Sequence, residues 1–80
     1  MIVLTVLSRP GCGLCNELID ALEPLVAGKA RIDIVDITED EELERRYLIE
    51  IPVLKHGDTE LCRYRLDSER LTRYLARLNS

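Results

Sequence analysis

Apolar residues along the 80-residue chain recur in two different periods, which predict strands and helices in turn. Residues 2–7 are almost continuously apolar and rich in branched side chains, which is typical of a strand covered on both faces. Loop residues at 8–11 end this strand. From Cys15 onward, an amphipathic helix is predicted by apolar residues three and four positions apart, namely Leu18, Ile19, Leu22, Leu25 and Val26. Because Pro24 lies within this stripe, we expect the helix to kink there or to stop just before it.

The middle of the chain predicts a second strand followed by a second helix. Residues 31–37 alternate between polar and apolar side chains, as in a strand. The spacing of Thr38 and Glu41 matches a capping box, in which each side chain caps the other's backbone at a helix start. The acidic residues at 39–42 suit the positive end of this helix, and Arg45 and Arg46 suit its later turns. The charge run is therefore interpreted as helix electrostatics.

The last third of the chain predicts a hairpin and a final helix. Residues 53–56 and 60–64 are interpreted as strands on either side of a Gly57-Asp58 turn, with His56 as a solvated residue beside it. Asp67 is placed to cap a helix with the stripe Leu71, Tyr74, Leu75 and Leu78, and Leu66 and Leu71 to form a hydrophobic staple. The predicted order is β-α-β-α-β-β-α, an α/β fold in which helices flank a four-stranded mixed sheet.

Composition and charge limit the classes of function. An apolar content of 46% and a charged content of 32% predict one folded domain spanning residues 1–80, although a chain of this size buries only about 60% of its unfolded surface. The net charge of −4 and the lack of a basic cluster argue against nucleic acid as a partner. The apolar run at 2–7 is too short to span a membrane and lacks the flanks of a signal peptide, so we expect a cytoplasmic protein.

The candidate chemistry lies in the motif Cys12-Gly13-Leu14-Cys15, between the first strand and the first helix. Unpaired N–H groups and partial positive charge at a helix start lower the pKa of a thiol to roughly 3.5–7.5 from about 8.5. Cys12 is predicted to be the exposed nucleophile, and Cys15, which begins the apolar stripe, the resolving thiol. Arg9 adds positive charge. Gly13 permits a tight backbone path, and Leu14 offers an apolar surface to a partner.

Two other interpretations of the cysteines remain open. A metal site needs four ligands, and beyond the pair the sequence offers only Cys62 and His56. Alternatively, both cysteines of the motif are buried structural residues. An odd number of cysteines does not suit a disulfide-stapled secreted scaffold and leaves redox chemistry or metal binding. Because there is no second Cys-x-x-Cys and the pair lies in a glycine-flanked loop, the redox interpretation, without a metal, is favoured. Cys62 is interpreted as a small core residue, with a regulatory or partner-bonding thiol as the alternative.

The segment at residues 8–15 resembles the active-site segment of glutaredoxins, a branch of the thioredoxin-like superfamily, with a basic residue three positions before the nucleophile. Ile51-Pro52-Val53 resembles the cis-proline loop of this family. The resemblance covers essentially the whole chain, and is strongest to short bacterial glutaredoxin-like proteins with a P-x-C-x-L-C segment and an IPVL segment. It implies a thioredoxin-like, glutaredoxin-type fold. It also implies that Arg9, Ile51 and Pro52 join the two cysteines in facing the substrate.

The resemblance implies a thiol–disulfide oxidoreductase without a bound cofactor. Its implied substrates are disulfide-containing or glutathionylated proteins, and its implied electron donor is glutathione, with a thioredoxin-type reductase as the alternative. The Gly-Gly pair that precedes the last helix in glutathione-binding members is absent from residues 61–67, and Leu14 stands where related motifs have Pro or Tyr. The rival hypothesis is a thioredoxin-like binding module, or a carrier of an iron–sulfur cluster, with a non-catalytic Cys-x-x-Cys.

Overall fold

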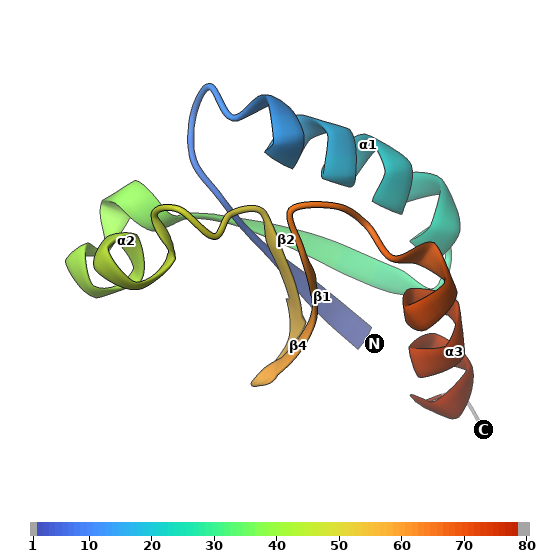
Figure 1. The fold of residues 1–80 in the computed structure, drawn as a ribbon. Helices are drawn as coiled ribbons and strands as arrows, with labels where there is room; N and C mark the ends of the chain where they lie inside the picture. Colours follow the sequence, from blue (N-terminus) through green and yellow to red (C-terminus); the bar gives the residue numbers. More distant parts are fainter. Residues whose placement is uncertain (1, 79–80) are drawn as a thin grey trace.

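The predicted order of strands and helices is confirmed in a computed structural model, which describes residues 2–78 (Figure 1). The strands are β1 (Ile2–Ser8), β2 (Ala30–Asp36), β3 (Val53–His56) and β4 (Thr59–Arg63). The helices are α1 (Gly13–Val26), α2 (Glu41–Tyr47) and α3 (Ser68–Leu78). A short 3₁₀ helix, η1 (Ile37–Glu39), precedes α2.

The four strands form one mixed sheet in the order β2-β1-β3-β4. The strands β1 and β2 run parallel, from Ile2 opposite Ala30 to Ser8 opposite Asp36, and α1 connects them. The strand β3 runs antiparallel to both β1 and β4, so the hairpin prediction is also confirmed. The strand β1 therefore lies inside the sheet, which explains its continuous apolar run.

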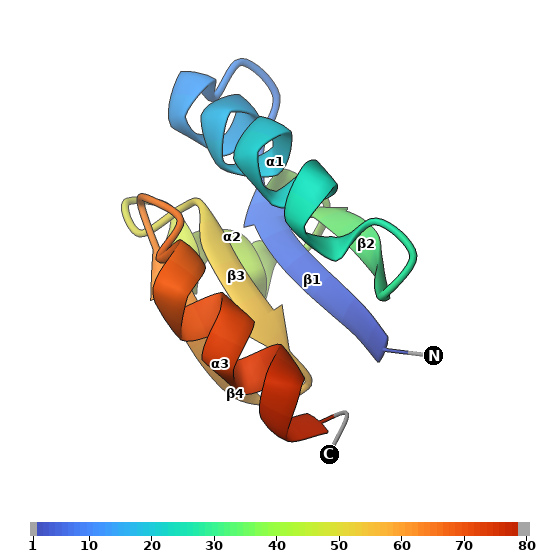
Figure 2. The same cartoon turned by 90° about the vertical axis from the view of Figure 1, so that its right-hand side faces the viewer.

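The core has two parts because β1 and β3 are buried on both faces. Leu4, Val6 and Leu54 face α1 and α3, where they pack with Leu18, Leu22, Val26, Leu61, Leu71 and Leu75. Leu7 and Val53 belong to the other part, which contains Cys15, Ile37, Tyr47 and Ile51. Figure 2 shows α1 and α3 on the near side of the strands and α2 behind them. The Cys-x-x-Cys motif thus lies at the N-terminal end of α1, where Cys15 belongs to the second part of the core and Cys12 packs against it.

The start of α2 differs from the predicted capping box. Asp36 Oδ1 accepts hydrogen bonds from the N–H of Thr38 at 2.9 Å and from its hydroxyl at 2.6 Å, which holds Thr38 in η1. Asp40 caps α2 instead, because its Oδ1 accepts from the N–H groups of Glu42 and Leu43 at 2.9 and 3.2 Å. Asp and Thr are both favoured at the N-cap, and here an aspartate caps each of the two short helices, so α2 begins at Glu41 rather than directly after Thr38.

The expected early end of α1 was wrong. The helix does not stop before Pro24 but continues to Val26, while the alternative expectation, a kink at Pro24, stays a prediction. Pro24 is exposed in the last turn, so its missing donor interrupts little of the helix. His56 is not a solvated turn residue. Its Nδ1 lies 2.6 Å from the hydroxyl of Tyr74, and the two rings meet edge to face, which ties the hairpin to α3.

No helix within residues 2–78 is long and apolar enough to cross a membrane.

Candidate redox site

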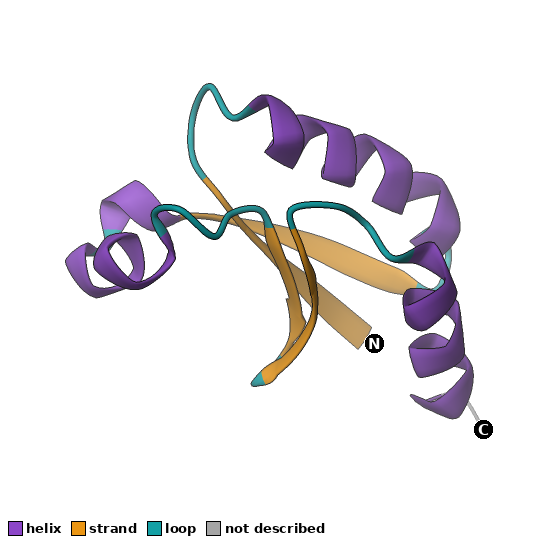
Figure 3. Ribbon diagram, in the orientation of Figure 1, coloured by secondary structure: helices purple, strands orange, loops and turns teal. Residues whose placement is uncertain are grey.

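Three connections come together at one end of the sheet, opposite the β3–β4 turn: β1 to α1, α2 to β3, and β4 to α3 (Figure 3). The first connection delivers the Cys-x-x-Cys motif, and the second contains Ile51-Pro52. The third follows the antiparallel pairing of β4 with β3. Parallel and antiparallel pairings around β1 and β3 therefore bring together segments that lie far apart in the sequence.

Cys12 and Cys15 are joined by a disulfide, with their Cα atoms 5.2 Å apart. Cys12 is the N-cap of α1, and its Sγ accepts a hydrogen bond from the N–H of Cys15 at 3.2 Å. Cys15 is completely buried, whereas Cys12 is partly exposed. A negative charge on Cys12 would be stabilised by this N–H group and by the positive end of the helix, while Cys15 is shielded from bulky partners.

The two residues between the cysteines, Gly13 and Leu14, were each predicted to have a role at the site. Leu14 is 45% exposed, as expected of an apolar surface beside the cysteines. Gly13 is not needed for a tight path, because a Cβ there would contact nothing within 4 Å. The glycine that the turn requires is Gly11, whose φ of +76° lies in the left-handed region. The requirement for a glycine was therefore predicted at Gly13 but falls two residues earlier, at Gly11.

The Ile51-Pro52 peptide bond is cis, as the resemblance implied. Ile51 shares a core cluster with Cys15, and Cys12 packs against this cluster, so the loop lies beside the disulfide. The side chains of Ile51 and Pro52 are both buried. Because of this burial, the loop can offer a bound segment its backbone groups rather than these side chains. Their contact with substrate stays a prediction.

An arginine that the sequence did not single out fastens the cis-proline loop to β4. Arg63 donates from Nε and Nη2 to the two carboxylate oxygens of Glu60, each at 2.7 Å. Its Nη1 lies 3.2 Å from Oε1 of Glu50, directly before the loop. The next residue, Tyr64, donates its N–H to the carbonyl of Pro52 at 2.8 Å. No motif in the sequence indicates this role, because it depends on the pairing of β3 with β4.

The stabilisation that the Arg63–Glu60 pair of β4 provides depends on pH, because the Glu60 carboxylate can be protonated. Hydrogen bonds from Arg63 lower the pKa of Glu60 below its ordinary value of 4.5. Its ionised form therefore stabilises the fold fully above that value, and this contribution is lost as the pH falls through the lowered pKa. We expect the Glu60→Gln variant to show a smaller fall in unfolding free energy between pH 5 and pH 3, measured by urea denaturation. A fall equal to that of the unchanged protein would contradict this prediction.

A hollow of about 370 Å³ lies beside the motif. Leu14 and Glu17 line it from the start of α1, and Tyr64 and Arg65 line it from the β4–α3 connection. Tyr64 has a φ of +68°, an uncommon conformation for a residue with a side chain, and such residues concentrate at functional sites. No residue pattern around Tyr64 indicates this conformation.

Arg9 is exposed on the other side of the motif, where it lines a separate hollow with Pro10, Ile34 and Asp36. Its predicted effect on the Cys12 thiol stays a prediction.

Cys62 is half-buried on β4 and packs against the first part of the core, away from the cluster that contains Cys15. Burial raises the pKa of Cys62, which keeps this thiol protonated at neutral pH. Across residues 2–78, no three side chains of His, Cys, Asp or Glu form a group that could hold a metal ion.

A mixed sheet of this topology, with a Cys-x-x-Cys disulfide at the start of α1 and a cis-proline beside it, defines a thioredoxin-like protein. The model of the glutaredoxin-like domain family DUF836 matches residues 3–76, and the chain belongs to this family.

The solved structures support the same fold. Protein XcR50 from X. campestris is 31% identical, and its X-ray structure superposes with a TM-score of 0.74 over 92% of this chain and 96% of that one. Its solution structure gives a TM-score of 0.73 over 96% and 95% of the two chains. Thioredoxin 1 from Thermosipho africanus, at 15% identity, covers 99% of this chain and 100% of its own with a TM-score of 0.64, which shows the fold alone. No curated protein is significantly similar to the chain in sequence.

Proposed function

We propose that this protein is a thiol–disulfide oxidoreductase that reduces disulfides through Cys12 and Cys15. The observation that carries the proposal is the disulfide at the N-terminus of α1, with one partly exposed sulfur and one buried sulfur. A dithiol that closes reversibly in this way can hold two electrons and pass them to another disulfide. The family membership supports the same chemistry.

The proposed reaction has two exchange steps. In the reduced protein, the Cys12 thiolate attacks one sulfur of the substrate disulfide, forms a mixed disulfide and releases the other substrate sulfur as a thiolate. The Cys15 thiolate then attacks the Cys12 sulfur, closes the Cys12–Cys15 disulfide and releases the second substrate thiol. The substrate gains two electrons and the protein dithiol loses two. The N–H of Cys15, which lies 3.2 Å from Cys12 Sγ, is placed to stabilise the attacking thiolate.

We propose that the substrates are disulfide-containing or glutathionylated proteins in the cytoplasm. Two molecules of glutathione could restore the dithiol by the reverse exchange, with a thioredoxin-type reductase as the alternative donor. Exposed Leu14 and Tyr64 beside the motif support contact with a polypeptide. The reaction requires no bound metal or organic cofactor, since the two sulfurs carry both electrons.

The pH dependence of alkylation tests this function, with Cys62 as an internal control. The fully reduced protein is treated with iodoacetamide from pH 4 to pH 9, and modification of each cysteine is followed by mass spectrometry. We expect Cys12 to react at pH 6, where Cys62 stays protonated because burial raises its pKa. If Cys12 reacted no faster than Cys62 at this pH, the proposal would be wrong.

Parallel turnover assays identify the electron donor. Reduction of a disulfide-bonded peptide is coupled in one arm to glutathione with glutathione reductase, and in the other to thioredoxin reductase. Turnover in either arm supports the proposal and identifies the donor, whereas none in both contradicts it. A brown protein on purification, with visible absorbance lost on acid treatment, would instead support the iron–sulfur carrier.

A further inference from the structure

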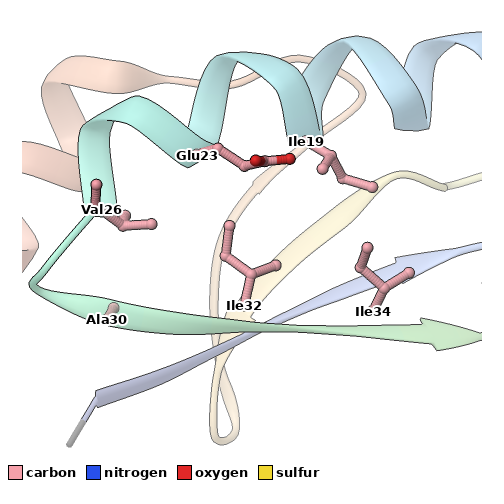
Figure 4. A pocket seen from close by; sticks show the side chains of 7 residues that line it. Ile19, Glu23, Val26, Ala30, Ile32 and Ile34 are labelled. Atoms are coloured by element: carbon pink, nitrogen blue, oxygen red, sulfur yellow. The ribbon is translucent and has the colours of Figure 1, made fainter.

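The strand β2 is an edge of the sheet with an open apolar groove along it. It pairs with β1 on one side, and no other described strand pairs with its outer side. Figure 4 shows Ile32 and Ile34 of this strand pointing toward Ile19 and Val26 of α1 across a hollow of about 410 Å³. Ile34 is 57% exposed. Open backbone groups beside exposed apolar side chains make such an edge a template for another strand.

The opposite face of β2 carries one positive and one negative side chain. Arg31 Nε lies 3.2 Å from Oδ1 of Asp33, and the two side chains are 62% and 46% exposed. Charged residues on an edge strand usually discourage pairing with another strand. Here, however, the two charges are opposite in sign and two positions apart, so their effect depends on the register in which a second strand approaches.

We propose that two copies of this chain associate by antiparallel pairing of their β2 strands, with the two-fold axis at Ile32. A two-fold axis perpendicular to the sheet keeps each face continuous, so residues from the same face of the two strands lie opposite each other. In this register, Arg31 of each copy lies opposite Asp33 of the other. The two Arg31 and two Asp33 side chains of the dimer then form the corners of a square in which every neighbour has the opposite charge. Side chains of like charge face each other only across the longer diagonals.

Three neighbouring registers with the same symmetry fit less well. An axis at Arg31 places two arginines directly opposite each other, and an axis at Asp33 does the same with two aspartates, both of which are destabilising. An axis at Ile34 places the apolar Ile32 opposite Asp36. The charges of β2 therefore select a register in which the strand is complementary to itself.

The apolar face supports the same register. With the axis at Ile32, the two Ile32 side chains meet at the centre, and Ala30 of one copy lies opposite Ile34 of the other. A small residue opposite a large one lets the side chains interlock and covers the exposed Ile34 in each copy. The groove between α1 and β2 thus becomes part of a continuous interface, which explains why β2 has an apolar side chain exposed at its edge.

Charge reversal tests the proposal by sedimentation velocity of the full chain over a range of concentrations, with a reductant present to prevent intermolecular disulfides. The unchanged protein is expected to dimerise. Arg31→Asp and Asp33→Arg are each expected to weaken association about ten-fold or more, because each creates two like-charged opposing pairs. Arg45→Asp, on the exposed surface of α2, makes the same change in net charge as Arg31→Asp and is expected to dimerise normally.

Restored complementarity makes the test specific to the register. An equal mixture of the Arg31→Asp and Asp33→Arg proteins is expected to form heterodimers, and the double variant is expected to recover the homodimer. An unchanged protein that stays monomeric at all concentrations would overturn the proposal and leave the edge to a different partner. So would single variants that dimerise normally, or a mixture and a double variant that fail to recover association.

Discussion

Cys12→Ser is expected to lose disulfide reduction, with turnover falling about a hundred-fold or more, because a serine hydroxyl is not ionised at neutral pH and cannot replace the thiolate. Cys12 is the partly exposed sulfur of the pair, and it occupies the N-cap of α1. The substrate sulfur must reach this atom first. Reduction of a disulfide-bonded peptide, coupled to whichever donor supports turnover, measures the loss.

Cys15→Ser is expected to behave differently, because the attacking thiolate is still present. The first exchange proceeds and the mixed disulfide accumulates, since the buried sulfur that would resolve it is missing. Intact-mass measurement after non-reducing work-up detects the adduct. Cys62→Ser serves as the matched control and is expected to turn over like the unchanged protein. If Cys15→Ser abolished the first step and Cys12→Ser trapped adducts, the roles assigned to the two sulfurs would be reversed.

The order of the elements could be predicted because burial follows their periods closely. Leu4 and Val6 face one part of the core and Leu7 faces the other, so the run in β1 reads as a strand buried on both faces. Leu18 and Leu22 recur at helical spacing on the buried face of α1. These signals are local in the sequence. The cis bond before Pro52 came from the family resemblance, since X–Pro bonds in general favour trans.

The features that sequence reasoning missed depend on contacts between distant segments or on competition among polar side chains. Thr38 matched a capping box, yet Asp36 binds the N–H of Thr38 itself, and Asp40 caps α2. His56 was expected to be solvated, but in the fold its ring contacts Tyr74 of α3. Arg63 became part of the site only because strand pairing placed it near Glu50. Tyr74 and Glu50 lie far along the chain from their partners, and the capping-box pattern does not show which of several neighbouring polar side chains binds the backbone.

Leu22→Ala is expected to cost about 2–5 kcal/mol of unfolding free energy, because Leu22 is completely buried between α1 and the sheet and its truncation leaves a cavity. A domain of this size has roughly 4–12 kcal/mol in total, so this one change removes a large share. Leu25→Ala, on the same helix but with the side chain 37% exposed, is the matched control and is expected to cost about 1 kcal/mol or less. Urea denaturation of both variants in the disulfide form measures the difference without involving the redox state. Equal costs at the two positions would contradict the packing of α1 against the first part of the core.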